Sequence, residues 1–365
     1  MRLRWMLAVA VPAAGLITSG HVIACAQAGA GPRTNPAVNV ADTSMILTAL
    51  PTPLPAAYDS LRLRDDGFLA GDAAHPLAEP TGVLSDAFGR VWVSDAVLHK
   101  LRRWDAGGQP LDETGALGSE AGQFRHPTAL ARVGSLGVAV LDVENRRVSA
   151  YDHHLRLLGA AVDLAAPELE ARIGRVNPVA LASDRGGAFY IADAERDRIL
   201  VFDYAGTFQR EIGGFGARAG GFSGLMAIAT GARGTLVTAE RPRGRAGRSA
   251  RLKQTAASDS TVARARVQWL DAGGRVIASA WTPAWAAGAG ETALSLALDD
   301  SGRVAVAGER SGELCVLSPL GVCVARMRGL AAPRGLAFTA DGVLLVAEAG
   351  AARVRRLILE PAGTE

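Results

Sequence analysis

The chain has 365 residues, a formal net charge of +3 and 5% aromatic residues. This length suits one large repeat domain or two ordinary domains. Its 43 glycines and 49% hydrophobic residues argue against a helical bundle and favour many short strands joined by tight turns. The net charge by itself points to no particular partner.

Residues 1–24 are predicted to be a signal peptide. Two arginines precede the apolar run Trp5–Ile17, which is too short to span a bilayer comfortably. The sequence Val22–Cys25 resembles the bacterial lipobox, in which the cysteine is lipidated and becomes the mature N-terminus. Ordinary cleavage after Ala26 is the alternative. We therefore expect an exported protein, anchored by lipid in the periplasm or at the outer membrane, or else secreted.

Two further segments differ from the rest of the chain in composition. Residues 25–56 are proline-rich without periodicity and are expected to form a flexible linker to a domain at 57–360. Residues 241–266 hold eight basic residues against one acidic residue, which predicts a disordered basic insertion. The insertion lacks interleaved aromatic residues, and export separates it from nucleic acid. A solvated loop or a contact with anionic lipid fits better.

The domain at 57–360 is built from internal repeats. In four copies an acidic residue follows a proline by fifteen positions: Pro80 and Asp95, Pro127 and Asp142, Pro178 and Asp193, Pro333 and Glu348. Two weaker copies have the same spacing, Leu225 with Glu240 and Ala293 with Gly308, the latter lacking the acid. Six copies therefore occupy the chain from residue 80 onwards.

Most repeats continue with a second hairpin, whose turn contains aspartate and glycine, as in Asp203–Gly206. Each repeat then supplies four short antiparallel strands, which cannot bury both faces alone but can pack radially. This predicts an all-β, six-bladed β-propeller. The last repeat is one strand short, so residues near Ser60–Arg64 should complete the sixth blade and close the ring.

The best copy, Ala192–Asp203, resembles the NHL repeat, and the similarity covers about residues 59–359. The resemblance implies a secreted bacterial six-bladed propeller. Some NHL-type amidating lyases bind zinc through histidines, and other six-bladed enzymes such as gluconolactonases hold calcium at the channel mouth. No cofactor or metal site is expected here, because the sequence lacks three histidines at equivalent positions and a clustered acid pair.

The recurring acids are predicted to be structural. A single active site does not need five symmetric copies, whereas a carboxylate at one blade position can bond the backbone of its own hairpin. Candidate ligand-binding residues are instead those that differ between blades at the start of the inner strands. They are Glu79, His126, Asn177, Glu291 and Arg334.

Two cysteines flank a turn signal near the end of the chain. If Cys25 carries lipid, Cys315 and Cys323 remain as a pair that could form a disulfide across a hairpin in an oxidising compartment. Two buried free thiols are the alternative.

These features favour a monomeric binding or scaffold module over an enzyme. Its partner would be a protein or a glycan of the cell envelope, with the membrane contacted through the lipid anchor. The alternative is a propeller hydrolase or lyase, lactonase-like or amidating-lyase-like, with its site in the central channel.

Overall fold

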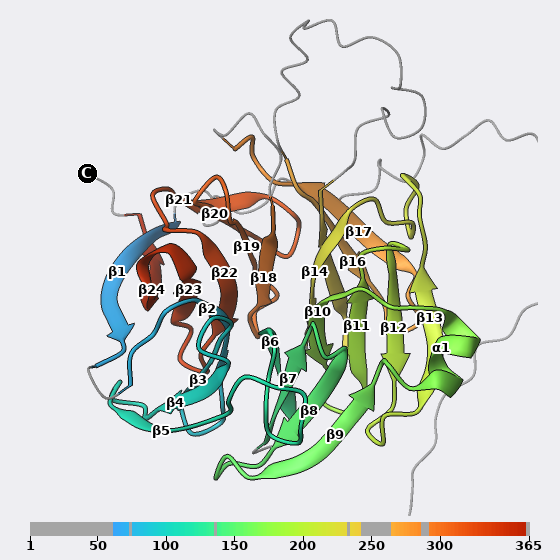
Figure 1. The fold of residues 1–365 in the computed structure, drawn as a ribbon. Helices are drawn as coiled ribbons and strands as arrows, with labels where there is room; N and C mark the ends of the chain where they lie inside the picture. The colour runs from blue at the N-terminus through green and yellow to red at the C-terminus, as the bar shows by residue number, and fades with distance from the viewer. Residues whose placement is uncertain are drawn as a thin grey trace, which may run out of the picture. The chain divides into compact units, whose positions relative to one another are not determined.

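The protein is described by a computed structural model over residues 61–72, 75–134, 137–231, 234–241, 264–285 and 292–362. Within these residues, 24 strands form six four-stranded antiparallel sheets. The sheets are arranged as blades around a central channel (Figure 1). The predicted six-bladed β-propeller is confirmed.

The blades follow one another in chain order. Blade one contains β2 (Pro80–Ser85), β3 (Val91–Asp95), β4 (Lys100–Trp104) and β5 (Pro110–Thr114). Blade two contains β6 (Pro127–Val133), β7 (Gly137–Asp142), β8 (Arg147–Tyr151) and β9 (Leu157–Asp163). Blade three contains β10 (Pro178–Ser183), β11 (Phe189–Asp193), β12 (Arg198–Phe202) and β13 (Phe208–Gly213).

The second half of the ring repeats this order. Blade four contains β14 (Leu225–Thr230), β15 (Leu236–Glu240), β16 (Arg266–Leu270) and β17 (Val276–Trp281). Blade five contains β18 (Leu294–Leu298), β19 (Val304–Gly308), β20 (Glu313–Leu317) and β21 (Cys323–Met327). Blade six contains β22 (Pro333–Phe338), β23 (Leu344–Glu348), β24 (Arg353–Pro361) and β1 (Leu61–Ala70).

Aspartates cap the tight turns within the blades, as the sequence predicted. In the turn between β12 and β13, the Asp203 carboxylate accepts hydrogen bonds from the backbone N–H groups of Ala205 and Thr207. Gly206 completes this turn with φ of 77°, a conformation that a residue with a side chain rarely adopts.

The ring is closed by the N-terminal strand of the propeller. β1 pairs antiparallel with β24, so the two ends of the domain share blade six (Figure 1). Two ion pairs support this pairing, Arg355–Asp65 at 2.6 Å and Arg356–Asp66 at 3.2 Å. Leu69 on β1 is buried against the core between blades six and one. The predicted closure is therefore present, with the strand running to residue 70.

The core lies between neighbouring blades. Leu141 of blade two packs in one apolar cluster with Ile191 and Phe202 of blade three, and all three are fully buried. The inner strands contact their neighbours all round the ring, β22 against β2 included. This arrangement sets one end of every inner strand at each mouth of the channel.

Three details qualify the sequence-based picture. A short helix, α1 (Pro167–Ile173), links blades two and three. Arg266, placed by sequence at the end of the basic insertion, is the first residue of β16. The predicted signal peptide and linker, Cys25 and most of residues 241–266 lie outside the described residues. No helix in the described part of the chain is long and apolar enough to cross a membrane.

Candidate functional site: the central channel

Six aliphatic side chains divide the central channel into two halves. Each stands three positions after the first residue of its repeat: Val83, Leu130, Leu181, Ile228, Leu296 and Leu336. All six line both channel cavities, so this aliphatic ring forms the floor of each. We name the cavity at the starts of the inner strands the proximal cup, of about 360 Å³, and the other the distal cup, of about 550 Å³.

Small residues line the proximal cup just above the aliphatic ring in five of the six blades. These are Gly82, Ala129, Ala180, Ala227 and Gly335. A Cβ atom on Gly82 would lie 2.0 Å from the carbonyl oxygen of Thr128 on the neighbouring blade. Glycine is therefore required there, because the adjacent inner strand approaches too closely for a side chain.

At one level of its wall, the proximal cup has a polar side and an apolar side, although Arg241, Thr292 and Ser295 also line the cup from blades four and five. One position further toward the mouth, blades one, two and six contribute Thr81, Thr128 and Arg334. At the same position, blades three, four and five contribute Val179, Met226 and Leu294. A cavity with an apolar floor, one apolar side and a few polar groups is typical of a small-molecule site.

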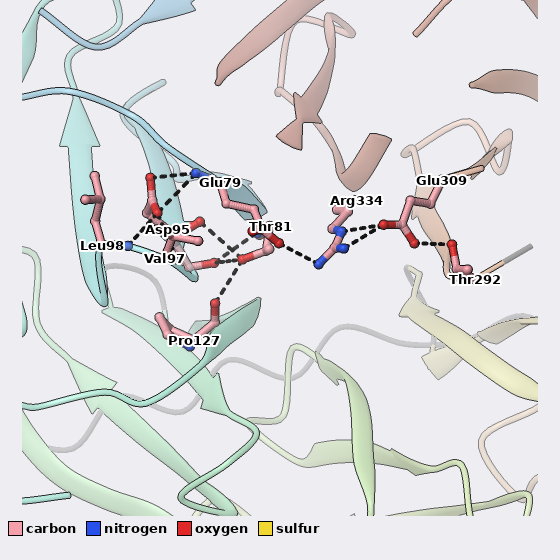
Figure 2. A network of polar contacts seen from close by, with 11 residues as sticks. Glu79, Thr81, Asp95, Val97, Leu98, Pro127, Thr292, Glu309 and Arg334 are labelled. Atoms are coloured by element: carbon pink, nitrogen blue, oxygen red, sulfur yellow. Dashed lines mark hydrogen bonds and ion pairs between the residues drawn. The ribbon is translucent and has the colours of Figure 1, made fainter. Parts of the chain in front are cut away.

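Arg334 joins the polar side of the mouth into one network (Figure 2). Its Nη1 lies 2.8 Å from Oε1 of Glu79, and its Nη2 lies 2.6 Å from Oε1 of Glu309. The hydroxyl of Thr292 donates to Oε2 of Glu309 at 2.5 Å. Blades one, six and five thus meet through one guanidinium and two carboxylates.

Glu309 is a site residue that sequence reasoning missed. Blade five has Gly308 where the other blades have the recurring acid, and Glu309 follows it directly. At the position of Glu309 the other blades have Ala96, Val143, Ala194, Arg241 and Ala349. The signal was a glutamate one residue beyond the expected acid, in the one repeat whose acid is missing.

The recurring acids are structural, as predicted. Their carboxylates are fully buried and accept hydrogen bonds from backbone N–H groups just before the inner strand of the same blade. Asp95 holds the N–H groups of Ala78 and Glu79, for example, and Asp142 holds that of His126. These acids therefore fix the backbone from which the mouth residues project.

The recurring acid of blade one, Asp95, lacks the arginine partner that the acids of four other blades have. In four blades an arginine opposite the acid pairs with it: Asp142–Arg147, Asp193–Arg198, Glu240–Arg266 and Glu348–Arg353. Lys100 stands opposite Asp95 but contacts Glu113 instead, at 2.9 Å. Asp95 has four backbone N–H donors and no ion pair in the described part of the chain.

Two other predicted mouth residues, His126 and Asn177, stand in blades two and three at the position that Glu79 has in blade one. His126 lines the proximal cup, whereas Asn177 precedes the lining residue Pro178, and its N–H bonds to Asp193. Glu291 lies outside the described residues. Within those residues, no group of three or more histidine, cysteine, aspartate or glutamate side chains is placed to hold a metal ion. The structure brings Glu79 and Arg334 into contact and leaves His126 apart from them.

Cys315 and Cys323 are free thiols in the structure, the first buried and the second half-buried. They lie on neighbouring strands, and hydrogen bonding with Cys315 lowers the pKa of Cys323 to about 7. The same contact, together with burial, raises the pKa of Cys315. The two sulfur atoms are thus close enough to interact, and the disulfide between them stays a prediction.

No protein-family model and no curated protein matches the chain. Solved structures do match. A streptogramin B lyase is 14% identical over 84% of this chain and 100% of its own, with a TM-score of 0.51. A gluconolactonase from Xanthomonas campestris is 14% identical over 80% and 88%, with a TM-score of 0.53. The calcium-binding protein regucalcin from Agrobacterium tumefaciens is 16% identical over 83% and 97%, with a TM-score of 0.52.

At these identities the matches establish the six-bladed fold and nothing finer. The three neighbours are a lyase, a lactonase and a calcium-binding protein, so the fold alone does not select an activity. The NHL assignment also stays a prediction.

Proposed function

We propose that this chain is an exported propeller that acts as a binding module in the cell envelope, with its ligand site in the proximal cup. The observation that carries this proposal is the shape of the cup: a cavity of about 360 Å³ with an aliphatic floor, one polar side and one apolar side. Pockets of this kind bury most of a small ligand or of a group projecting from a larger protein or glycan partner.

A propeller hydrolase or lyase is the second candidate, because the network at the mouth does unite side chains from three blades. Both carboxylates of the network, however, are paired with the single guanidinium of Arg334. General acid–base chemistry needs a carboxylate within hydrogen-bond reach of the reacting proton, whereas Arg334 already occupies Oε1 of both carboxylates. The geometry therefore supports binding better than proton transfer.

Obstructing the proximal cup should abolish ligand binding. Val179→Trp places a large ring on the apolar side of the cup, where the half-buried valine now lies. We expect small fragments that bind the wild-type protein, detected by ligand-observed NMR across amines, alcohols, carboxylates and sugars, to lose their signal in this variant.

The matched control is Val97→Trp, which makes the same change at an exposed site in the turn between β3 and β4. This control should retain the wild-type signals, and gel filtration should show both variants folded. Fragments that bind all three proteins equally would contradict a site in the cup. Chemical conversion of a bound fragment would replace the binding proposal with the enzyme candidate.

Export and anchoring form the second part of the proposal, supported by the signal-like N-terminus and the lipobox-like Val22–Cys25. Cys25→Ser should move the protein from the membrane fraction to the soluble fraction of fractionated cells, because the lipid has no attachment site. Unchanged membrane retention would refute lipidation at Cys25. Secretion of the wild-type protein would favour cleavage after Ala26.

A further inference from the structure

We propose that the proximal cup takes a small organic cation of amphipathic build. Its ammonium group would lie at the mouth beside Glu79 and Glu309, and its apolar body would reach down to the aliphatic ring. This inference rests on the proposed function, since it specifies the ligand of the same site.

Charge at the mouth is the first argument. Glu79 and Glu309 both contact Arg334, so two carboxylates meet one guanidinium on this side of the cup. The Asp95 carboxylate bonds the N–H of Glu79 and has no arginine partner of its own. Arg241 lines the cup from blade four, toward its apolar side. The network of Glu79, Glu309 and Arg334 therefore carries one net negative charge at the mouth, which attracts a cation.

Glu79 can also accept a further hydrogen bond from a ligand. Arg334 contacts Oε1 of Glu79, and Oε2 has no partner among the described residues, although a carboxylate oxygen can accept two hydrogen bonds. Its side chain is 28% exposed, so this oxygen can be reached from the mouth. Both oxygens of Glu309, in contrast, already accept hydrogen bonds. Glu79 is thus the residue that would receive the ammonium N–H.

The order of charged and apolar layers from the mouth to the floor of the cup sets the orientation of the ligand. The acids stand at the mouth, Arg334 and its five counterparts form the next layer, and the aliphatic ring lies below them. An alkyl or aromatic body pointing inward would exchange water for this apolar floor and for the side formed by Val179, Met226 and Leu294. A lysine side chain projecting from a partner would enter with its charge first and meet the apolar floor, so a free amphipathic amine fits better.

A carboxylate or a sugar fits the same cup less well. A carboxylate would have to displace Glu79 or Glu309 to pair with Arg334, and the other arginine of the cup, Arg241, lies on blade four, away from this network. A sugar would place hydroxyl groups against the aliphatic ring without hydrogen-bond partners, which costs free energy. These two ligand classes are the alternatives that the experiment must separate.

Three probes of equal length and different charge test the inference: n-hexylammonium, n-hexanol and n-hexanoate. Dissociation constants are measured by titration calorimetry or ligand-observed NMR on the full-length protein. We expect hexylammonium to bind about tenfold more tightly than hexanol, as a hydrogen bond to a charged group implies, and hexanoate to bind least. Glu79→Gln should remove this tenfold advantage and leave hexanol binding unchanged.

The control is Asp300→Asn, which removes a carboxylate whose side chain is 88% exposed and lines the distal cup, beyond the aliphatic ring. It should leave hexylammonium binding unchanged. Hexanoate binding as tightly as hexylammonium, or Glu79→Gln having no effect, would overturn the inference. The inference would also be overturned if sugar fragments were the only fragments to lose their signal in Val179→Trp. The proposed function would stand in that case. If no molecule distinguishes the wild type from Val179→Trp, the proposed function itself fails.

Discussion

A chain that begins at Gly71, and so lacks β1, is expected to lose the closed ring and to aggregate. Without β1, the nine-residue strand β24 becomes a free edge and exposes a row of unpaired backbone groups. The deletion also removes Leu69 from the core between blades six and one. Losing one buried leucine costs about 2–5 kcal/mol, a large part of the 5–15 kcal/mol that holds a typical domain folded.

Gel filtration and thermal unfolding give the readout, and a chain that begins at residue 57 provides the control. The control retains β1 together with its ion pairs Arg355–Asp65 and Arg356–Asp66. It should elute as a monomer and unfold at the same temperature as the full-length chain. A monomeric protein of unchanged unfolding temperature after deletion of β1 would show that the N-terminal strand does not close the ring.

The fold could be predicted from the sequence because each repeat contains the residues that form its own blade. The spacing of fifteen residues between Pro80 and Asp95 recurs in every repeat and equals the length of one hairpin. The acid accepts a hydrogen bond from the backbone of its own blade. Closure could also be inferred, since the last repeat lacks a strand and residues near Ser60 supply one. Each of these features follows from short-range geometry.

The site was predictable only in part, because it depends on contacts between distant blades. Glu79 and Arg334 were both selected from their place at the ends of inner strands, but their contact exists only because the ring brings blade six against blade one. Glu309 was missed because blade five breaks the pattern at Gly308, and Glu309 lies one residue beyond the repeated position. The residue that follows this departure is the one that joins the network at the mouth.

The aliphatic ring could have been predicted from the sequence. Its members occupy one offset in all six repeats, from Val83 to Leu336, so aligning the inner strands displays an unbroken apolar column. What the sequence could not give was the consequence of this column, because only the assembled channel shows that the six side chains form a shared floor. The short helix α1, by contrast, carries local signals in Pro167 at its start and in Glu168 and Glu170 in its first turn.

Replacing one recurring acid should destabilise the propeller strongly. The Glu240 carboxylate is fully buried and accepts hydrogen bonds from Ser223 N–H, the Arg266 guanidinium and the Gln268 amide. Glu240→Ala leaves Arg266 buried without its counter-charge. Breaking a buried ion pair in this way costs about 3–5 kcal/mol, so the midpoint of chemical denaturation should fall clearly.

Two further variants separate the lost charge pair from the lost volume. The double variant Glu240→Leu with Arg266→Met replaces both charges by apolar groups of similar size, and it should recover part of the loss because no unpaired charge remains. Arg185→Ala breaks the exposed Arg185–Asp300 pair, whose side chains are 82% and 88% exposed, and should change the midpoint little. If Glu240→Ala behaves like Arg185→Ala, the recurring acids do not hold the blades, and their fifteen-residue spacing then needs a functional explanation.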